Sequence, residues 1–135
     1  MRDRYVLDSY AIIAYLRAEA GAVRTRELLE AAGAGAALLL MSLVNLGEVA
    51  YLVERRSGRP TLQRVLAILS QLPIDIVAPD MEQTLGAAGL KAIHPLSYAD
   101  AFAAALAASH DATLVTGDPE FRALEPQLSI LWLER

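Results

Sequence analysis

The sequence contains no cysteine, a single lysine and only two histidines among its 135 residues. Without cysteine the chain has no disulfide framework, no thiol nucleophile and no zinc–thiolate site. This composition fits a reducing compartment such as the cytoplasm. Aromatic residues make up only 6% of the chain, and alanine supplies much of the apolar content. That balance favours closely packed helices over a thick aromatic core.

Long hydrophobic runs are missing as well. The longest candidate, residues 31–41, is broken by Gly33 and Gly35 and falls short of the roughly 20 apolar residues that cross a bilayer. The first residues carry two arginines and an aspartate and lead straight into an apolar stretch, so they do not resemble a signal peptide. We therefore expect a cytoplasmic protein that makes no contact with a membrane.

No glycine-rich loop of the Walker type occurs, which argues against a nucleotide-binding module. The net charge of −4 also lacks the overall positive field of most nucleic-acid binders. Positive charge is instead local and nearly all arginine. It is gathered in two groups, Arg55, Arg56, Arg59 and Arg64, and Arg17, Arg24 and Arg26. These arginines either form solvated helix faces or contact phosphate, and the planar guanidinium favours phosphate.

Short apolar runs alternate with helical periodicity along the whole chain, which we interpret as one domain over residues 1–135. This alternation predicts an α/β fold whose largely parallel sheet is covered by helices on both faces. In such sheets, ligands bind beyond the carboxyl ends of the strands. We expect strands at 5–7, 37–41, 74–77, 112–115 and 129–133, and helices at 9–18, 22–32, 43–56, 60–72, 80–94, 97–110 and 119–124.

Four carboxylates lie at or near these strand ends. Asp8 follows the first strand, and Asp118 follows the strand at 112–115. Glu48 lies in an otherwise apolar helix, three residues after Asn45 and therefore on the same face. Asp100 begins an alanine-rich helix in the pattern Ser-x-x-acid. Each acid except Glu48 also has a simple role as a helix-capping residue, and Glu48 has one as a solvated side chain. The four together point to a site.

Clustered carboxylates without histidine or cysteine are hard oxygen ligands, which suit Mg²⁺ or Mn²⁺ rather than zinc. A bound metal ion lowers the pKa of its water, so such a site needs no nucleophilic side chain. Ser9 and Thr116 lie close to the acids in sequence and either position water or phosphate or are ordinary loop hydroxyls. We interpret His94 and His110 as structural residues.

Four short blocks resemble the signature blocks of the PIN-domain ribonucleases, and the small size resembles the VapC toxins of toxin–antitoxin pairs. The blocks are residues 6–9, 45–49, 98–101 and 116–121. The resemblance implies a three-layer α/β/α sandwich with a five-stranded parallel sheet, and an endoribonuclease that uses Mg²⁺ or Mn²⁺. It also implies a homodimer and a VapB-like antitoxin that blocks the site. Carried over, the acidic ligands would be Asp8, Glu48, Asp100 and Asp118, with Ser9, Asn45 and Thr116 in support. Gly117 departs from the larger residues often found at its position.

Three other functional interpretations of the acidic residues remain open. An aspartyl-phosphate phosphatase would carry an acid two residues after the first aspartate, where this chain has Tyr10. A phosphoacceptor receiver domain would carry a lysine after a late strand, and Lys91 does not follow one. A non-catalytic interaction domain would use every acid as a helix cap.

The early helices carry more large apolar residues than a single buried stripe requires. We expect the surplus to form a groove for an apolar helix of a regulatory partner, with part of it serving a homodimer. The residues are Tyr10, Ile12, Ile13, Tyr15, Leu16, Val44, Tyr51, Leu52, Val53, Leu62, Val65, Leu66 and Leu69.

Overall fold

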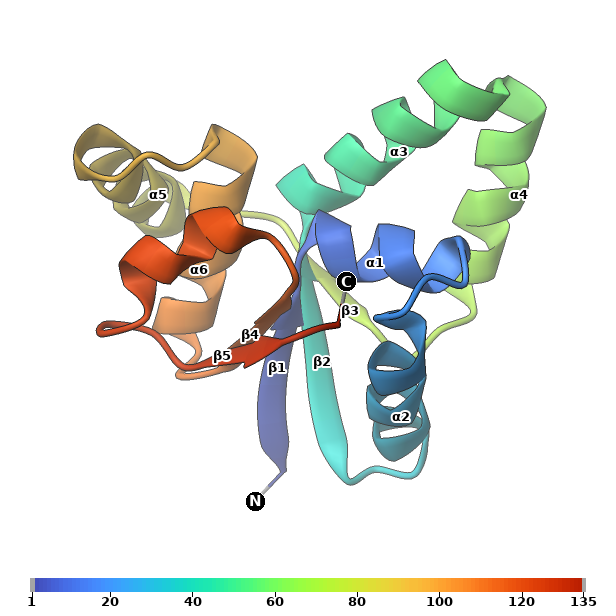
Figure 1. Ribbon diagram of the computed structural model, residues 1–135, viewed down its shortest axis with the longest axis horizontal. Helices are drawn as coiled ribbons and strands as arrows, with labels where there is room; N and C mark the ends of the chain where they lie inside the picture. Colours follow the sequence, from blue (N-terminus) through green and yellow to red (C-terminus); the bar gives the residue numbers. More distant parts are fainter. Residues whose placement is uncertain (1, 135) are drawn as a thin grey trace.

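The computed structural model describes residues 2–134 and shows strands alternating with helices, as the sequence predicts (Figure 1). The elements are β1 (Asp3–Leu7), α1 (Ser9–Leu16), α2 (Ala22–Gly33), β2 (Ala37–Ser42), α3 (Leu43–Ser57), α4 (Arg59–Ser70), β3 (Asp75–Val77), α5 (Met81–Ile93), α6 (Tyr98–Ser109), β4 (Thr113–Thr116), the 3₁₀ helix η1 (Pro119–Leu124) and β5 (Ile130–Trp132). The predicted strands and helices are therefore confirmed in type and order.

Within residues 2–134 the strands form one five-stranded sheet in the order β3-β2-β1-β4-β5, and every neighbouring pair is parallel. Val6 of the central strand β1 is in register with Leu40 on one side and Leu114 on the other. Because all strands run the same way, their carboxyl ends meet at one edge of the sheet. The predicted α/β class, with a parallel sheet, is confirmed.

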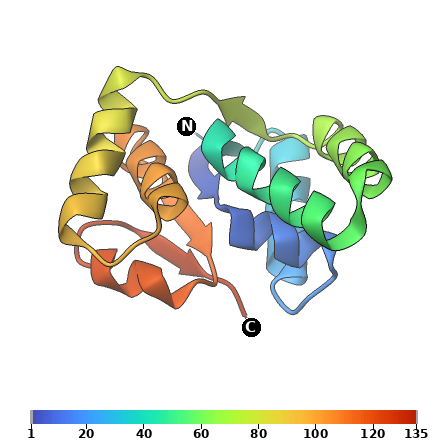
Figure 2. The ribbon, with the colours of Figure 1, turned by 90° about the horizontal axis from the view of Figure 1, so that it is seen from above.

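Helices cover both faces of this sheet and produce three layers. Successive residues of a strand point to opposite faces. Val6 accordingly packs into a core with α6, while its neighbour Leu7 packs into a second core with α1 and α2. Figures 1 and 2 show α5 and α6 on one side and α1 and α2 on the other. The alanines of α6 are buried, so this helix lies close against the sheet.

Helices α3 and α4 extend from the carboxyl edge of the sheet as an antiparallel pair (Figure 1). None of the side chains of α4 is fully buried, and Leu66 and Ile68 are exposed. This pair therefore leaves apolar surface open to solvent. Among residues 2–134, no helix has both the length and the apolar character needed to cross a membrane.

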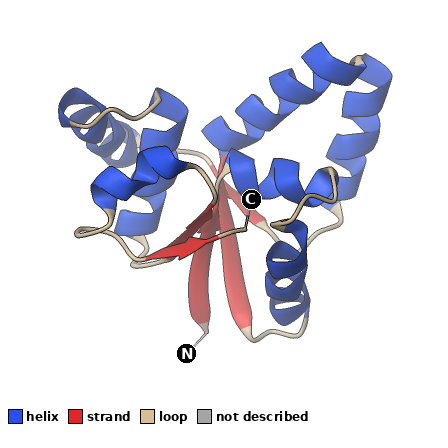
Figure 3. Cartoon of the chain, viewed as in Figure 1, coloured by secondary structure: helices blue, strands red, loops and turns tan. Residues whose placement is uncertain are grey.

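Several helices and strands end one or two residues away from the sequence-based expectation, although their order along the chain is as expected (Figure 3). The first helix ends at Leu16 rather than at residue 18, because Ala18 has a positive φ of 53° that no α-helix accommodates. The short helix predicted at residues 119–124 is present and is a 3₁₀ helix. Its tighter turn draws neighbouring side chains together at the edge of the sheet.

Candidate functional site

A hollow of about 360 Å³ opens at the carboxyl edge of the sheet. All four acids singled out from the sequence line it, together with a fifth, Glu120. The lining residues are Asp8, Ser9, Tyr10, Ile13, Glu48, Leu52, Ser97, Asp100, Asp118 and Glu120. The structure thus gathers side chains from α1, α3, α6 and η1 and from the residues that cap these helices. Asn45 and Thr116 lie behind this lining and hold it in place.

Asp8 is the most deeply placed of the acids, with 1% of its surface exposed. Its carboxylate caps α1 by accepting a hydrogen bond from the backbone N–H of Ala11, at 2.9 Å. The other carboxylate oxygen accepts a short hydrogen bond from the Thr116 hydroxyl. Burial raises the pKa of Asp8 to about 7, despite these two hydrogen bonds that favour the charged form. The capping role and a place in the acidic hollow therefore coexist in one residue.

Thr116 connects two of the acids through its hydroxyl group. Besides donating to Asp8, its Oγ1 accepts a hydrogen bond from the backbone N–H of Asp118, at 3.0 Å. Asp118 in turn caps η1 by accepting from the backbone N–H of Glu120, at 3.0 Å. This chain of hydrogen bonds fixes the loop after β4 against the end of β1. Thr116 itself is completely buried, so its side chain contacts the acids from the interior of the protein.

Glu48 and Asn45 project from the first half of α3. The Ser9 hydroxyl donates a short hydrogen bond to Glu48, which turns this half-buried carboxylate toward the hollow. Asn45 is fully buried, and its Nδ2 donates to the backbone carbonyl of Ala99, at 3.1 Å. Since Ala99 precedes Asp100, this hydrogen bond sets the position of α6 relative to α3.

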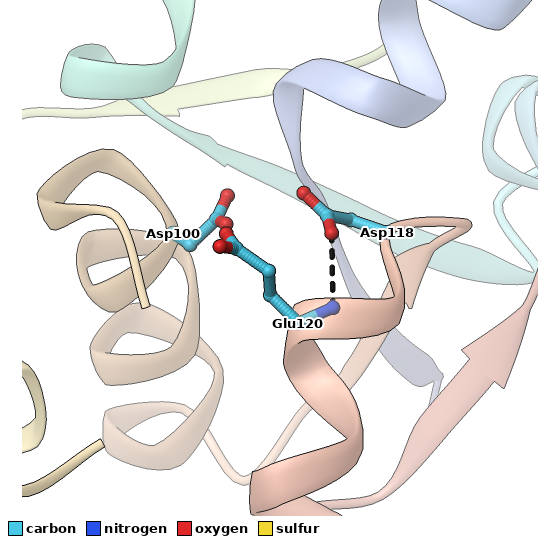
Figure 4. A group of neighbouring side chains, drawn as sticks. All are labelled: Asp100, Asp118 and Glu120. Carbon is cyan, nitrogen blue, oxygen red and sulfur yellow. Dashed lines mark hydrogen bonds between the residues drawn. The ribbon is translucent and has the colours of Figure 1, made fainter. Parts of the chain in front are cut away.

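Asp100, Asp118 and Glu120 form the tightest group of acids (Figure 4). One carboxylate oxygen from each lies within 4.8 Å of the other two. Burial, the hydrogen bond with Glu120 and the negative charges of Asp118 and Asp8 raise the pKa of Asp100 to about 8. The Ser97 side chain acts in the opposite direction. These carboxyl groups thus lie so close together that their negative charges are unfavourable without a cation, which is the electrostatic condition of a cation site.

Glu120 was not among the residues selected from the sequence. A signal was nevertheless present, because Asp118-Pro119-Glu120 starts a helix in which the second acid falls in the first turn. Acids in a first turn are common, since they interact favourably with the helix dipole. Only the 3₁₀ geometry and the approach of α6 bring the Glu120 carboxylate to Asp100.

Gly117 is explained by the ring of Tyr10. A Cβ atom at position 117 would lie 2.3 Å from Cε1 of Tyr10 and 2.5 Å from its Cζ. Both distances are far below van der Waals contact, so a glycine is required as long as the tyrosine stays in place. The aromatic ring thus occupies the space that a larger residue would fill at position 117.

We expect Gly117→Ala to lower the free energy of unfolding by about 1–3 kcal/mol, the usual cost of overpacking. In a Tyr10→Ser background the same substitution should cost much less, since the clashing ring is gone. Urea denaturation of the four proteins measures this coupling. Gly89→Ala is the matched control, because a Cβ there meets nothing within 4 Å. Equal costs with and without the Tyr10 ring would contradict the contact.

Comparison with known proteins places this geometry in a family. The sequence model of the PIN domain matches residues 5–125. The chain belongs to the PIN-domain family. No match was found among curated proteins.

Solved structures with this PIN fold include several complexes of toxin–antitoxin pairs. A chain of VapBC2 from Rickettsia felis, bound to a DNA fragment of its promoter, is 20% identical with a TM-score of 0.77, covering 97% of this chain and 99% of that one. VapC20 from Mycobacterium tuberculosis, a toxin that cleaves the sarcin–ricin loop, is 20% identical with a TM-score of 0.70, covering 88% and 93%. VapBC-1 from nontypeable Haemophilus influenzae is 21% identical with a TM-score of 0.71, covering 96% and 97%. The expected likeness to VapC toxins is confirmed at the level of the fold.

Proposed function

We propose that this PIN domain is an endoribonuclease dependent on Mg²⁺ or Mn²⁺ and acts as the toxin of a VapBC-type pair. The observation that carries the proposal is the gathering of five carboxylates around one hollow at the carboxyl ends of the strands. The structural likeness to VapC20, whose sarcin–ricin loop substrate is an RNA, supports the substrate class. Acids that served only as helix caps would have no reason to gather from four parts of the chain around one hollow.

The donor set fits a divalent cation. Asp100, Asp118 and Glu120 offer three carboxylate oxygens within 4.8 Å of one another, and all are hard ligands of the kind that Mg²⁺ and Mn²⁺ prefer. The raised pKa values of Asp8 and Asp100 also favour a cation site, because a bound cation would offset the burial and the charge repulsion that raise them. Histidine and cysteine are absent from the lining, which disfavours zinc.

Each side chain of the site has a distinct role in this proposal. We assign Asp8, Glu48, Asp100 and Asp118 as ligands, with Glu120 as a fifth acid that holds the cation beside Asp100. Ser9 orients Glu48, Thr116 orients Asp8, and Asn45 fixes the spacing of their helices. When bound, the metal ion supplies a water of lowered pKa and stabilises charge on the phosphate.

The direct test is incubation of the purified protein with structured RNAs in Mn²⁺, Mg²⁺ or EDTA. We expect cleavage with either metal ion and none in EDTA. A phosphoacceptor domain, the second candidate, would instead take up phosphate on Asp8 from a small phosphodonor and leave RNA intact. Its expected lysine is not supported, since Lys91 lies on α5 and does not line the hollow.

We expect Arg55 and Arg56 to contact the RNA, because they lie on α3, the helix that carries Glu48. Arg2 directly precedes β1 and Arg4 lies near its amino end, at the opposite end of the strand from the hollow. Replacing Arg55 and Arg56 together by alanine should weaken RNA binding about tenfold at moderate salt, in line with the loss of two phosphate contacts. The matched double variant of Arg2 and Arg4 should change it little. Fluorescence anisotropy measures the RNA affinity of both double variants. A larger loss of affinity on replacing Arg2 and Arg4 would place the RNA at the amino end of the strands instead.

The antitoxin-like partner would use a groove of about 210 Å³ between α1, α3 and α4. Its apolar wall contains Ile13, Val53 and Val65, and it is flanked by Arg17 and Arg56. An amphipathic helix with acidic flanks fits this surface, as in other helix-in-groove complexes. We also propose a homodimer, for which the exposed apolar residues of α5 offer a surface.

Val65→Glu should abolish co-purification with a VapB-like protein encoded beside this chain, because it places a charge in the apolar wall. RNA cleavage should persist, since Val65 does not line the acidic hollow. Val23→Glu, the same change at an exposed valine of α2 outside the groove, is the control and should keep the partner bound. A complex that survives Val65→Glu would exclude this groove.

A further inference from the structure

Trp132 is the only tryptophan of the chain and lies at the end of β5 with 36% of its surface exposed. It is in register with Thr116 on the neighbouring strand, so it lies one strand spacing from the residue that supports Asp8. Its Nε1 donates a hydrogen bond to the carboxylate of Glu125, at 3.3 Å. This bond holds the indole in one orientation.

The indole borders a second hollow, of about 320 Å³. Gly117, Pro119, Arg122 and Glu125 line this hollow as well. Because Gly117 and Pro119 flank Asp118 in the chain, one loop separates the two hollows. A polymer engaged at the acids can therefore place its next unit over this loop against the indole.

The chemistry of the second hollow differs from that of the first. One arginine and one glutamate balance each other's charge, so the hollow does not favour a phosphate group. An exposed aromatic face and a guanidinium group are the two surfaces on which unpaired bases stack. The planar edge of a base also finds a donor in Arg122 and an acceptor in Glu125.

We propose that this second hollow binds one unpaired RNA base, stacked on Trp132, beside the phosphodiester held at the acids. The inference rests on the proposed ribonuclease function and adds a binding site for the substrate. Trp132 is then a residue that sets where the RNA is held, and cleavage requires an unstacked nucleotide next to the cut. The RNA class preferred is accordingly single-stranded, or a loop within a structured RNA.

The single tryptophan makes the test direct. Stopped-flow mixing with a short unstructured oligoribonucleotide should quench the fluorescence of Trp132 before cleavage proceeds. Inorganic polyphosphate, which has the charge but no bases, should leave the fluorescence unchanged. Quenching by both, or by neither while the RNA is cut, overturns the base-binding site and leaves the ribonuclease proposal standing.

Two variants separate stacking from general damage. Trp132→Leu should raise KM for a single-stranded RNA about tenfold, the size of one base–aromatic stack, with kcat within about threefold of wild type. Trp132→Phe retains an aromatic face and should stay within about threefold in both constants. Equal KM values for the wild type and Trp132→Leu overturn the inference. If no RNA is bound or cut by the wild type, this inference and the proposed function both fail.

Discussion

Replacing Asp100 by asparagine should abolish RNA cleavage and at the same time stabilise the metal-free protein. Asp100 is 5% exposed and lies beside Glu120 and Asp118. Removing its charge deprives the cation of a ligand, and we expect a loss on the order of a hundredfold or more in kcat. Without metal, the same change relieves burial of charge and repulsion between acids. We expect a gain of about 1–3 kcal/mol in the free energy of unfolding at pH 8.

The control for this experiment is Asp80→Asn. Asp80 caps α5 by accepting from the backbone N–H of Gln83, at 2.8 Å, but it is exposed and lies outside the hollow. Asparagine also caps helices well, so this variant should keep both stability and cleavage. If Asp100→Asn is inactive because it unfolds more readily than the wild type, Asp100 has a structural role and the metal site is misassigned.

The metal-free protein should lose stability as pH rises from about 4 to about 8. The pKa values of Asp8 and Asp100 are raised from 3.8 to about 7 and about 8 in the folded chain. The folded state therefore holds these protons more tightly than the unfolded state, and unfolding releases them in this range. Their contribution to stability is fully present below pH 4 and is lost as pH rises through the folded pKa values.

Thermal unfolding in EDTA across this pH range measures the effect. The slope should be shallower in Asp100→Asn, which lacks one of the two groups. Mn²⁺ should raise the melting temperature more at pH 8 than at pH 5, because protons compete with the cation for the same carboxylates. A stability that is flat with pH, or a metal effect that is larger at pH 5, would show that the acids are not buried together.

The sheet could be predicted from the sequence because its strands are short, apolar and separated by clear helix signals. Asp8 and Asp118 could be selected for the same reason, since Asp8 directly follows β1 and Asp118 comes two residues after β4. Glu120 could not, because its place depends on a 3₁₀ turn and on how closely α6 approaches. That approach is set by packing between elements far apart in the chain, and local patterns contain no information about it.

Gly117 and Trp132 illustrate the same limit. The departure of Gly117 from larger residues was visible in the sequence, but its cause lies in Tyr10, more than a hundred positions away. Trp132 closes a strand and looks like an ordinary core residue until its neighbours are known. Only the register between β4 and β5 places its indole beside the loop that carries Asp118.

The central claim is that these carboxylates hold a metal ion whose water cuts RNA, and the ends of the product RNA test it most directly. Cleavage by metal-activated water leaves linear phosphate and hydroxyl ends, whereas attack by the neighbouring 2′-hydroxyl leaves a 2′,3′-cyclic phosphate. We predict linear ends only, from an RNA cut in Mn²⁺ by the wild type, and no products from Asp100→Asn prepared in parallel. Cyclic phosphate ends, or equal cleavage by the two proteins in EDTA, would contradict the account.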